Sequence, residues 1–312
     1  MFENELGRRP EKHPVTNLII ILLMVGLGFV VVGPIIGFFA ALPFYDGGMV
    51  QLAEAIQRPM ENPGIKIPLY IIQGFATLTG LIAAPAMYLM REKKSIADFF
   101  KHKGFQWVPA LITASIVIIF MAVNSVFIEW NSEFNFPEFA REFERWARER
   151  ENTAAELTKF LTDFDSGGQL ILALVIIAVL PAIGEEIVFR GLIQNELFRG
   201  TRNIHLSIWF AAVLFSAIHF QFFGFVPRLL LGALFGYLYY WSGSLALAIL
   251  AHFVNNAVSV VALYMYQQGS VTFDLESEKA APVNIVILSA VLTAGLLYYF
   301  YKYYQDRKIA MH

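Results

Sequence analysis

The chain has 312 residues, of which 57% are hydrophobic and 15% are charged, and its formal net charge is −2. Soluble proteins carry about 25% charged residues, so this composition is typical of a polytopic membrane protein. The near-neutral charge predicts no nucleic-acid partner, and the absence of cysteine excludes disulfides, thiolate metal ligands and a cysteine nucleophile.

Eight apolar segments predict an all-α, polytopic membrane helix bundle, because a spanning helix needs about 20 apolar residues. The first segment is longer than the apolar region of a signal peptide and lacks a convincing cleavage site, so we expect a retained span. The sixth is short, but a Trp-Ser-Gly-Ser turn at 241–244 favours two spans there over one. The expected spans are 18–42, 67–90, 107–128, 169–189, 204–222, 229–241, 244–266 and 283–301.

One substantial polar segment, 129–166, separates the third and fourth expected spans. Its core predicts an amphipathic helix with a charged face opposite an apolar one. That helix would lie on the membrane surface near a substrate entrance, or cover the bundle as a solvated cap. Mixed acidic and basic residues argue against a dedicated anionic-lipid site. The apolar positions are Phe136, Phe139, Phe143, Trp146 and Ala147.

Lysine and arginine residues gather in four regions that an eight-span protein would place on one side. Because cytoplasmic loops are enriched in these residues, both termini are predicted to be cytoplasmic and the segment 129–166 to lie outside. We expect an integral protein of a bacterial cytoplasmic membrane. The four regions contain Arg8, Arg9 and Lys12; Arg91, Lys93, Lys94, Lys101 and Lys103; Arg199 and Arg202; and Lys302, Arg307 and Lys308. The opposite loops contain Arg58, Lys66, Arg228 and Lys279, apart from the long polar segment.

Two adjacent glutamates, Glu185 and Glu186, lie in the fourth apolar segment. A charge at the centre of a membrane helix costs roughly 2.5–3.5 kcal/mol, so such residues are usually functional. Glu186 and Arg190 are four residues apart and share a helix face, which favours an ion pair. Glu185 lies about 100° around the helix from Glu186. It is therefore left available as a general base.

Further polar residues occur in later apolar segments. His219 lies near the end of the fifth, where a packing role is also open, and His252 and Asn256 are four residues apart in the seventh. Gln73 and Asn124 are interpreted as structural. Intramembrane Glu, Arg and His residues also form proton relays, so a proton-coupled transporter is an alternative to an enzyme. A scaffold that binds partner proteins is a third hypothesis.

Three ordered motifs resemble the CPBP (Abi) family of intramembrane proteases, which includes the type II CAAX prenyl endopeptidases. They are Glu185-Glu186-x-x-x-Arg190, Phe215-x-x-x-His219 and His252-x-x-x-Asn256. The resemblance implies a compact, all-helical membrane bundle with a polar cavity open to the cytoplasm, and we expect about eight helices around it. It assigns a catalytic core to 169–266, between an N-terminal region, 1–168, and a C-terminal region, 267–312.

The resemblance also implies roles for the site residues. Glu185 would activate a water molecule, with Glu186 and Arg190 supporting it, and His219 would orient the water or share its proton. His252 and Asn256 would form the oxyanion hole. In a zinc-dependent version, Glu185, His219 and His252 would be the metal ligands; we expect a mechanism without a metal. The expected partners are the lipid bilayer and a membrane-associated protein or peptide, either hydrophobic or prenylated as in CAAX substrates.

Overall fold

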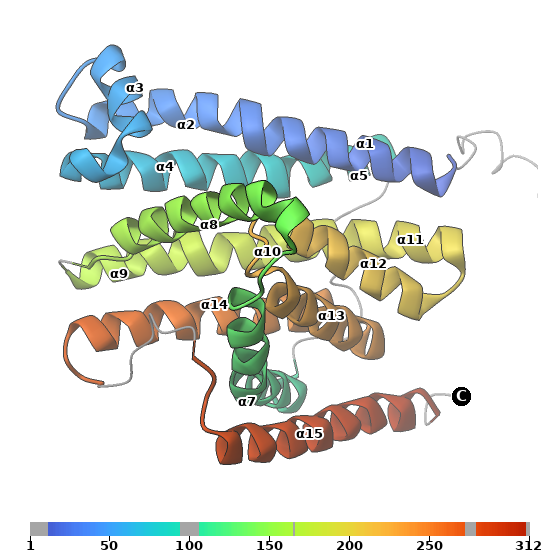
Figure 1. Ribbon diagram of the computed structural model, residues 1–312. Coiled ribbons are helices and arrows are strands. Elements are labelled where there is room, and N and C mark those ends of the chain that lie inside the picture. The colour runs from blue at the N-terminus through green and yellow to red at the C-terminus, as the bar shows by residue number, and fades with distance from the viewer. Residues whose placement is uncertain (1–11, 94–105, 165, 272–278, 310–312) are drawn as a thin grey trace, which may run out of the picture.

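The computed structural model describes residues 12–93, 106–164, 166–271 and 279–309 (Figure 1). The regular elements of these residues are all helices, which confirms the predicted all-α class. The predicted turn at 241–244 is also confirmed: Gly243 adopts a φ of 65°, a left-handed conformation that glycine takes at little cost.

The N-terminal half contains α1 (Pro14–Leu27), η1 (Gly28–Val32), α2 (Gly33–Ala41), α3 (Met49–Gln57), α4 (Lys66–Thr77), η5 (Leu78–Ala83), α5 (Ala84–Arg91), α7 (Trp107–Ser132) and α8 (Arg141–Leu161). The C-terminal half contains α9 (Gly167–Ala173), η7 (Leu174–Val179), α10 (Leu180–Glu186), η8 (Ile187–Ile193), α11 (Gln194–Thr201), α12 (Ile204–Ala217), α13 (Phe225–Ser242), α14 (Leu245–Gln267) and α15 (Val283–Ile309). The elements η1, η5, η7 and η8 are π-helical segments within longer helices.

Six helices in the described ranges are long and apolar enough to cross a membrane, so the predicted count of eight is not confirmed. The two remaining expected spans correspond to α12 and α13, which pack against each other as a hairpin. Helix α12 has 14 residues and is roughly 21 Å long, less than the ~30 Å of a hydrocarbon core. The six spans are Pro14–Phe44, Pro63–Arg91, Trp107–Ser132, Gly167–Thr201, Leu245–Gln267 and Val283–Asp306.

The fourth span is longer than the predicted 169–189. It runs without interruption from Gly167 to Thr201 through α9, α10 and α11, and we call it the site helix. Glu185 therefore lies near its middle rather than near its end. The predicted span ended directly before the charged residue Arg190, which is paired with Glu186 inside the helix. Farther along, Arg199 Nη2 lies 2.7 Å from Glu196 Oε2 in the last turns.

The four basic regions were predicted to lie on one side of the protein, and their described residues do lie at one end of the molecule. The start of α1 and the ends of α5, α11 and α15 lie at one end of the molecule (Figure 1). Lys12, just before α1, contacts the ends of two other helices. Its Nζ lies 2.9 Å from Glu92 Oε1, directly after α5, and its carbonyl accepts from Arg199 Nη2 of α11 at 2.7 Å. Which compartment this end faces stays a prediction. Arg8, Arg9, Lys94, Lys101 and Lys103 lie outside the described residues.

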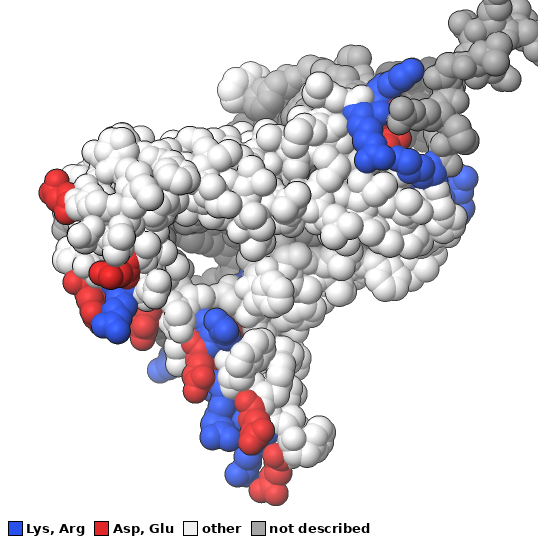
Figure 2. Space-filling model, turned by 90° about the horizontal axis from the view of Figure 1, so that it is seen from above, with Lys and Arg blue, Asp and Glu red and all other residues white. Residues whose placement is uncertain are grey.

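The predicted amphipathic helix is present as α8, although it begins later, at Arg141. Phe143 packs against Phe136 and against Phe222 of the α12–α13 connection, with ring centroids 5.3 and 5.8 Å apart, whereas Phe139 is 91% exposed. Hydrogen bonds from the Phe136 N–H and from Arg148 lower the pKa of the Glu144 carboxyl. The charged ridge of α8 lies across the molecule from the basic end (Figure 2).

Glycines allow the first two spans to pack closely. A Cβ added at Gly33 would lie 2.5 Å from Ala76 Cα, and one at Gly80 would lie 2.5 Å from Phe29 Cβ. Small residues at such contacts let membrane helices approach until their backbones touch, and van der Waals packing then stabilises the pair. This pair of spans supplies one wall of the central cavity described below.

We expect Gly33→Ala to lower the free energy of unfolding by about 1–3 kcal/mol, because the added methyl group overpacks the contact with α4. Thermal unfolding in detergent measures the change. Gly295→Ala is the matched control, since a Cβ there meets nothing within 4 Å. Equal stability of the Gly33 and Gly295 variants would contradict the packing role of Gly33.

Candidate functional site

The residues of the three sequence motifs gather around one cavity of about 910 Å³ in the centre of the bundle. Glu185, His219, His252 and Asn256 line it, whereas Glu186 and Arg190 lie behind its wall. Most of its other lining is apolar. The polar and charged side chains that line it in addition are Gln73, Thr77, Asn124, Glu151, Arg228 and Asn255.

A buried ion pair supports the cavity wall. Arg190 Nη1 donates to Glu186 Oε1 at 2.7 Å, and the two side chains are 1% and 0% exposed. Arg190 Nη2 donates to the Gly232 carbonyl at 2.8 Å, and its guanidinium lies over the rings of Phe215 and Phe235. The predicted Glu186–Arg190 pairing is therefore seen. It also ties the site helix to α13.

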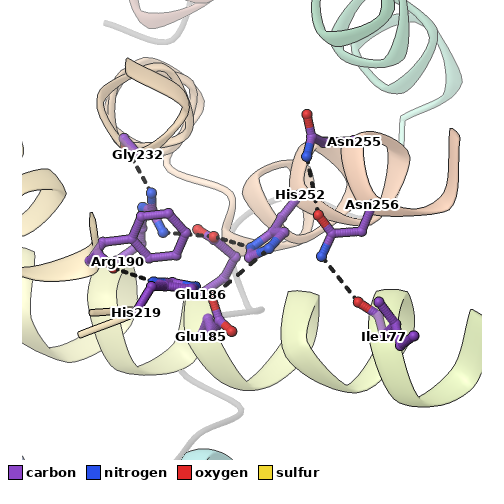
Figure 3. A network of polar contacts seen from close by, with 10 residues as sticks. Ile177, Glu185, Glu186, Arg190, His219, Gly232, His252, Asn255 and Asn256 are labelled. Atoms are coloured by element: carbon purple, nitrogen blue, oxygen red, sulfur yellow. Dashed lines mark hydrogen bonds and ion pairs between the residues drawn. The ribbon is translucent and has the colours of Figure 1, made fainter. Parts of the chain in front are cut away.

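His252 lies between the two glutamates (Figure 3). Its Nδ1 lies 2.8 Å from Glu186 Oε1, and its Nε2 lies 3.9 Å from Glu185 Oε2. Because a carboxylate oxygen accepts, Nδ1 carries the proton of this hydrogen bond. In the neutral ring Nε2 then presents a lone pair toward Glu185. Phe235 stacks on the imidazole at a centroid distance of 5.3 Å and fixes its plane.

Asn256 is oriented by a backbone carbonyl of the site helix. Its Nδ2 donates to the Ile177 carbonyl at 3.2 Å, while its Oδ1 accepts from Asn255 Nδ2 at 3.1 Å. Pro181, four residues after Ile177, has no N–H to give this carbonyl a helical hydrogen bond. An amide nitrogen carries two protons, so Asn256 keeps one donor beyond its bond to Ile177.

His219 does not lie on a helix, which corrects its predicted place in the fifth span. Helix α12 ends at Ala217, and Phe220 has a φ of 52°, which an α-helix does not allow. The Nδ1 of His219 donates to the Phe215 carbonyl at 2.8 Å. His219 was predicted to act with Glu185, but these two described side chains form no direct hydrogen bond with each other. The imidazole beside Glu185 is that of His252.

Several residues of the site were missed or underestimated from the sequence. Phe215 contacts Arg190, His219 and His252 with its ring. Arg228 was counted as a loop residue but lines the cavity, as do Gln73 and Asn124, which were interpreted as structural. A charged side chain directly before the apolar run of α13 was the available signal for Arg228.

The side chains do not fit the zinc alternative. A zinc site needs three or four ligands converging at about 2.0–2.3 Å from one point. Within the described ranges no three His, Asp or Glu residues are grouped so that they could hold a metal ion, and this includes Glu185, His219 and His252. We therefore derive no reaction step through a metal.

The cavity extends to the amphipathic helix α8. Glu151 of α8 lines it, and a hollow is visible beside the charged ridge of α8 (Figure 2). Which compartment the cavity opens to stays a prediction.

Comparison with known proteins agrees with the three motifs. Residues 167–258 match the model of a family described as "Type II CAAX prenyl endopeptidase Rce1-like". The chain is also 30% identical over 89 residues to "Uncharacterized protein YpbD" of Bacillus subtilis (strain 168), which covers 27% of this chain and 42% of YpbD. No solved structure matches the chain.

The family match confirms the resemblance drawn from the motifs for residues 167–258. This segment contains all residues of the three sequence motifs, which are Glu185, Glu186, Arg190, Phe215, His219, His252 and Asn256. The chain spans less than half the length of YpbD.

We expect Arg190→Met to lower the free energy of unfolding by about 3–5 kcal/mol, because it leaves the Glu186 carboxylate buried without its cation. Chemical unfolding in detergent measures the effect. Arg58→Met is the matched control: Arg58 also pairs with a glutamate, but both side chains are about 70% exposed, so its loss should cost about 0–1 kcal/mol. Similar losses for both variants would contradict the structural role of the buried pair.

Proposed function

We propose that this protein is an intramembrane endopeptidase in which Glu185 activates the attacking water. The observation that carries this proposal is the position of Glu185 beside His252 at the wall of a large, mainly apolar cavity. The match of residues 167–258 to an endopeptidase family supports the same reaction class. The Glu185 carboxylate and the imidazoles of His219 and His252, which line one cavity, are groups that general acid–base catalysis uses.

We place the attacking water between Glu185 and His252. The Glu185 Oε2 and His252 Nε2 atoms are 3.9 Å apart, and a water hydrogen-bonded to both would lie about 2.8 Å from each. Oε2 is buried and has no other partner in the described part of the chain. The water would donate one proton to each atom. Its lone pairs would then point away from both acceptors, toward a substrate carbonyl.

The proposed reaction uses Glu185 as base and then as acid. The water oxygen attacks the carbonyl carbon of the peptide bond while its proton moves to the Glu185 carboxylate. When the C–N bond breaks, the Glu185 carboxyl returns this proton to the leaving nitrogen. The products are a carboxylic acid and an amine, and Glu185 is again ionised. His219, which lines the same cavity, is the candidate for orienting the water or substrate.

Asn256 is the better candidate for the oxyanion donor. Its remaining N–H is available in the present state, whereas His252 Nε2 can donate only after it has taken up a proton. Such a donor is worth about 2.7–4 kcal/mol of transition-state stabilisation. The Glu186–Arg190 pair fixes His252 through Nδ1, and we assign both residues a positioning role.

The apolar lining supports a substrate presented from the bilayer. Several lining residues are also exposed on the outside of the molecule, among them Leu22, Phe29 and Val30 of the first span and Phe220 after α12. A lipidated or hydrophobic peptide could pass between these side chains without leaving an apolar environment. We propose such peptides as substrates, with prenylated CAAX-type peptides as one class to test.

We expect Glu185→Gln to lower peptide cleavage at least about a hundredfold, because the amide cannot accept the proton of the water. Cleavage of hydrophobic and lipidated peptides by protein reconstituted in liposomes measures the effect, with thermal unfolding as a check on folding. Glu196→Gln is the matched control: Glu196 is a buried glutamate of the same helix that pairs with Arg199, and its loss should leave cleavage near the wild-type rate.

Three outcomes would contradict this assignment. Full activity of Glu185→Gln would show that another group is the base. Loss of activity on chelation, restored by Zn²⁺, would favour the zinc-dependent version. A pH-dependent flux of protons or ions through the liposome membrane, with no peptide cleavage, would favour the transporter alternative.

A further inference from the structure

An asparagine in the second half of α7 lines the cavity with an unsatisfied amide. Asn124 is 5% exposed and belongs to the lining. Its Oδ1 is buried and has no hydrogen-bond partner within the described ranges. A buried amide oxygen that gives up water without gaining a donor costs free energy. Such groups are rare in folded proteins, and in the wall of a cavity a ligand can supply the missing donor.

The same face of α7 shows how such an amide binds a peptide backbone. Asn131 lies seven residues after Asn124, which is nearly two helical turns, so the two side chains share a face. Asn131 Nδ2 donates to the Phe222 carbonyl at 3.2 Å, and its Oδ1 accepts from the Val226 N–H at 2.8 Å. One amide therefore satisfies both a carbonyl and an N–H of an irregular segment. Asn124 presents the same group about 10 Å farther along the helix, at the cavity.

A second amide lines the same cavity from α14. Asn255 Nδ2 donates to Asn256 Oδ1 at 3.1 Å, and Figure 3 shows the Oδ1 of Asn255 pointing away from Asn256. Asn256 is the proposed oxyanion donor. Because α14 packs against α7, amides from two adjoining helices line the cavity that holds the reaction centre.

We propose that Asn124 and Asn255 bind the backbone of the substrate peptide and hold it beside Glu185. This inference rests on the proposed endopeptidase function and assigns substrate-binding residues to the same cavity. A peptide in a mainly apolar cavity has left water, so its N–H and C=O groups need partners there. An asparagine amide supplies an acceptor and two donors. Its χ2 torsion is broad, so either end of the Asn124 amide can turn toward the peptide.

Recognition by amides reads the backbone of the substrate and not its side chains. The apolar remainder of the lining accommodates apolar side chains or a lipid, whereas the asparagines fix the chain that is cut. Asn255 is hydrogen-bonded to Asn256, and an extended chain advances ~3.3–3.6 Å per residue. The peptide unit that Asn255 binds should therefore lie within about two residues of the cleaved bond.

A purely structural role is the alternative for Asn124. Its loss would then slow the cleavage of every peptide by the same factor. Replacing one amide of the substrate by an ester removes a single N–H donor and leaves the length and shape of the chain nearly unchanged. The ratio of kcat/KM between the amide and the ester peptide therefore separates the two roles. Protein that has not folded cancels from this ratio.

The experiment uses one hydrophobic, lipidated peptide and a set of derivatives with a single ester at successive positions beside the cleaved bond. The full-length protein is reconstituted in nanodiscs. We expect wild type to cleave the all-amide peptide with a kcat/KM about tenfold or more above that of the ester derivatives at two positions, because each of these esters leaves an asparagine oxygen without its donor. Asn124→Leu should bring the ratio close to one at one position, and Asn255→Leu at the position nearer the cleaved bond.

Asn17→Leu is the matched control. Asn17 is a buried asparagine of α1 whose Oδ1 also has no partner in the described ranges, but it does not line the cavity, so its loss should leave every ratio at the wild-type value. Wild-type ratios near one at all positions, or Asn124→Leu and Asn255→Leu variants that keep the wild-type ratios, would overturn the proposal. If no peptide is cleaved, the proposed function fails, and equilibrium binding of the same peptides decides the proposal by the same ratios.

Discussion

The buried ion pair between Glu186 and Arg190 is the interaction on which the candidate site depends. Glu186 Oε1 accepts hydrogen bonds from both Arg190 and His252, so one carboxylate neutralises a buried cation and fixes an imidazole. Removing two charges from water is costly and is offset only when the pair is well hydrogen-bonded. The Gly232 carbonyl and the rings of Phe215 and Phe235 complete the surroundings of Arg190. Each glutamate keeps one buried oxygen without a hydrogen-bond partner among the described residues. Glu185 differs because it lines the cavity, whereas Glu186 lies behind its wall, and this position leaves Glu185 available for chemistry.

The irregular segment between α12 and α13 follows from a second constraint, the need to satisfy backbone groups away from water. Helix α12 is too short to cross a full bilayer, and the residues after it turn back into α13. Their backbone donors and acceptors are met by Asn131, Glu151 and Ser216. This turn carries His219 and Arg228 to the cavity. The same hydrogen bonds connect α7 and α8 to the site. These two helices lie outside the family match at 167–258, and they also shape the site.

Much of this arrangement could be predicted from the sequence, because it depends on local spacing. Glu186 and Arg190 are four residues apart and pair as expected, and the Gly243 turn separates two helices as expected. Contacts between distant segments could not be predicted: nothing in the local pattern shows that His252 lies closer to Glu185 than His219 does, or that Arg228 turns into the cavity. The predicted fourth span ended at residue 189, directly before Arg190, because a run of apolar residues does not show that a helix continues through the paired charges of Arg190, Glu196 and Arg199. The count of eight spans is not confirmed at α12 and α13, because two apolar segments in a sequence do not show whether each helix crosses the membrane.

The central claim is that Glu185 and His252 act together on one water molecule. A double-mutant cycle on the cleavage rate, with Glu185→Gln, His252→Ala and the combined variant, tests it most directly, because residues that act as a unit give strongly non-additive effects. The account predicts that the combined variant is no slower than the slower of the two single variants. Rate losses that multiply in the combined variant would show that the two residues act independently, and would contradict the account.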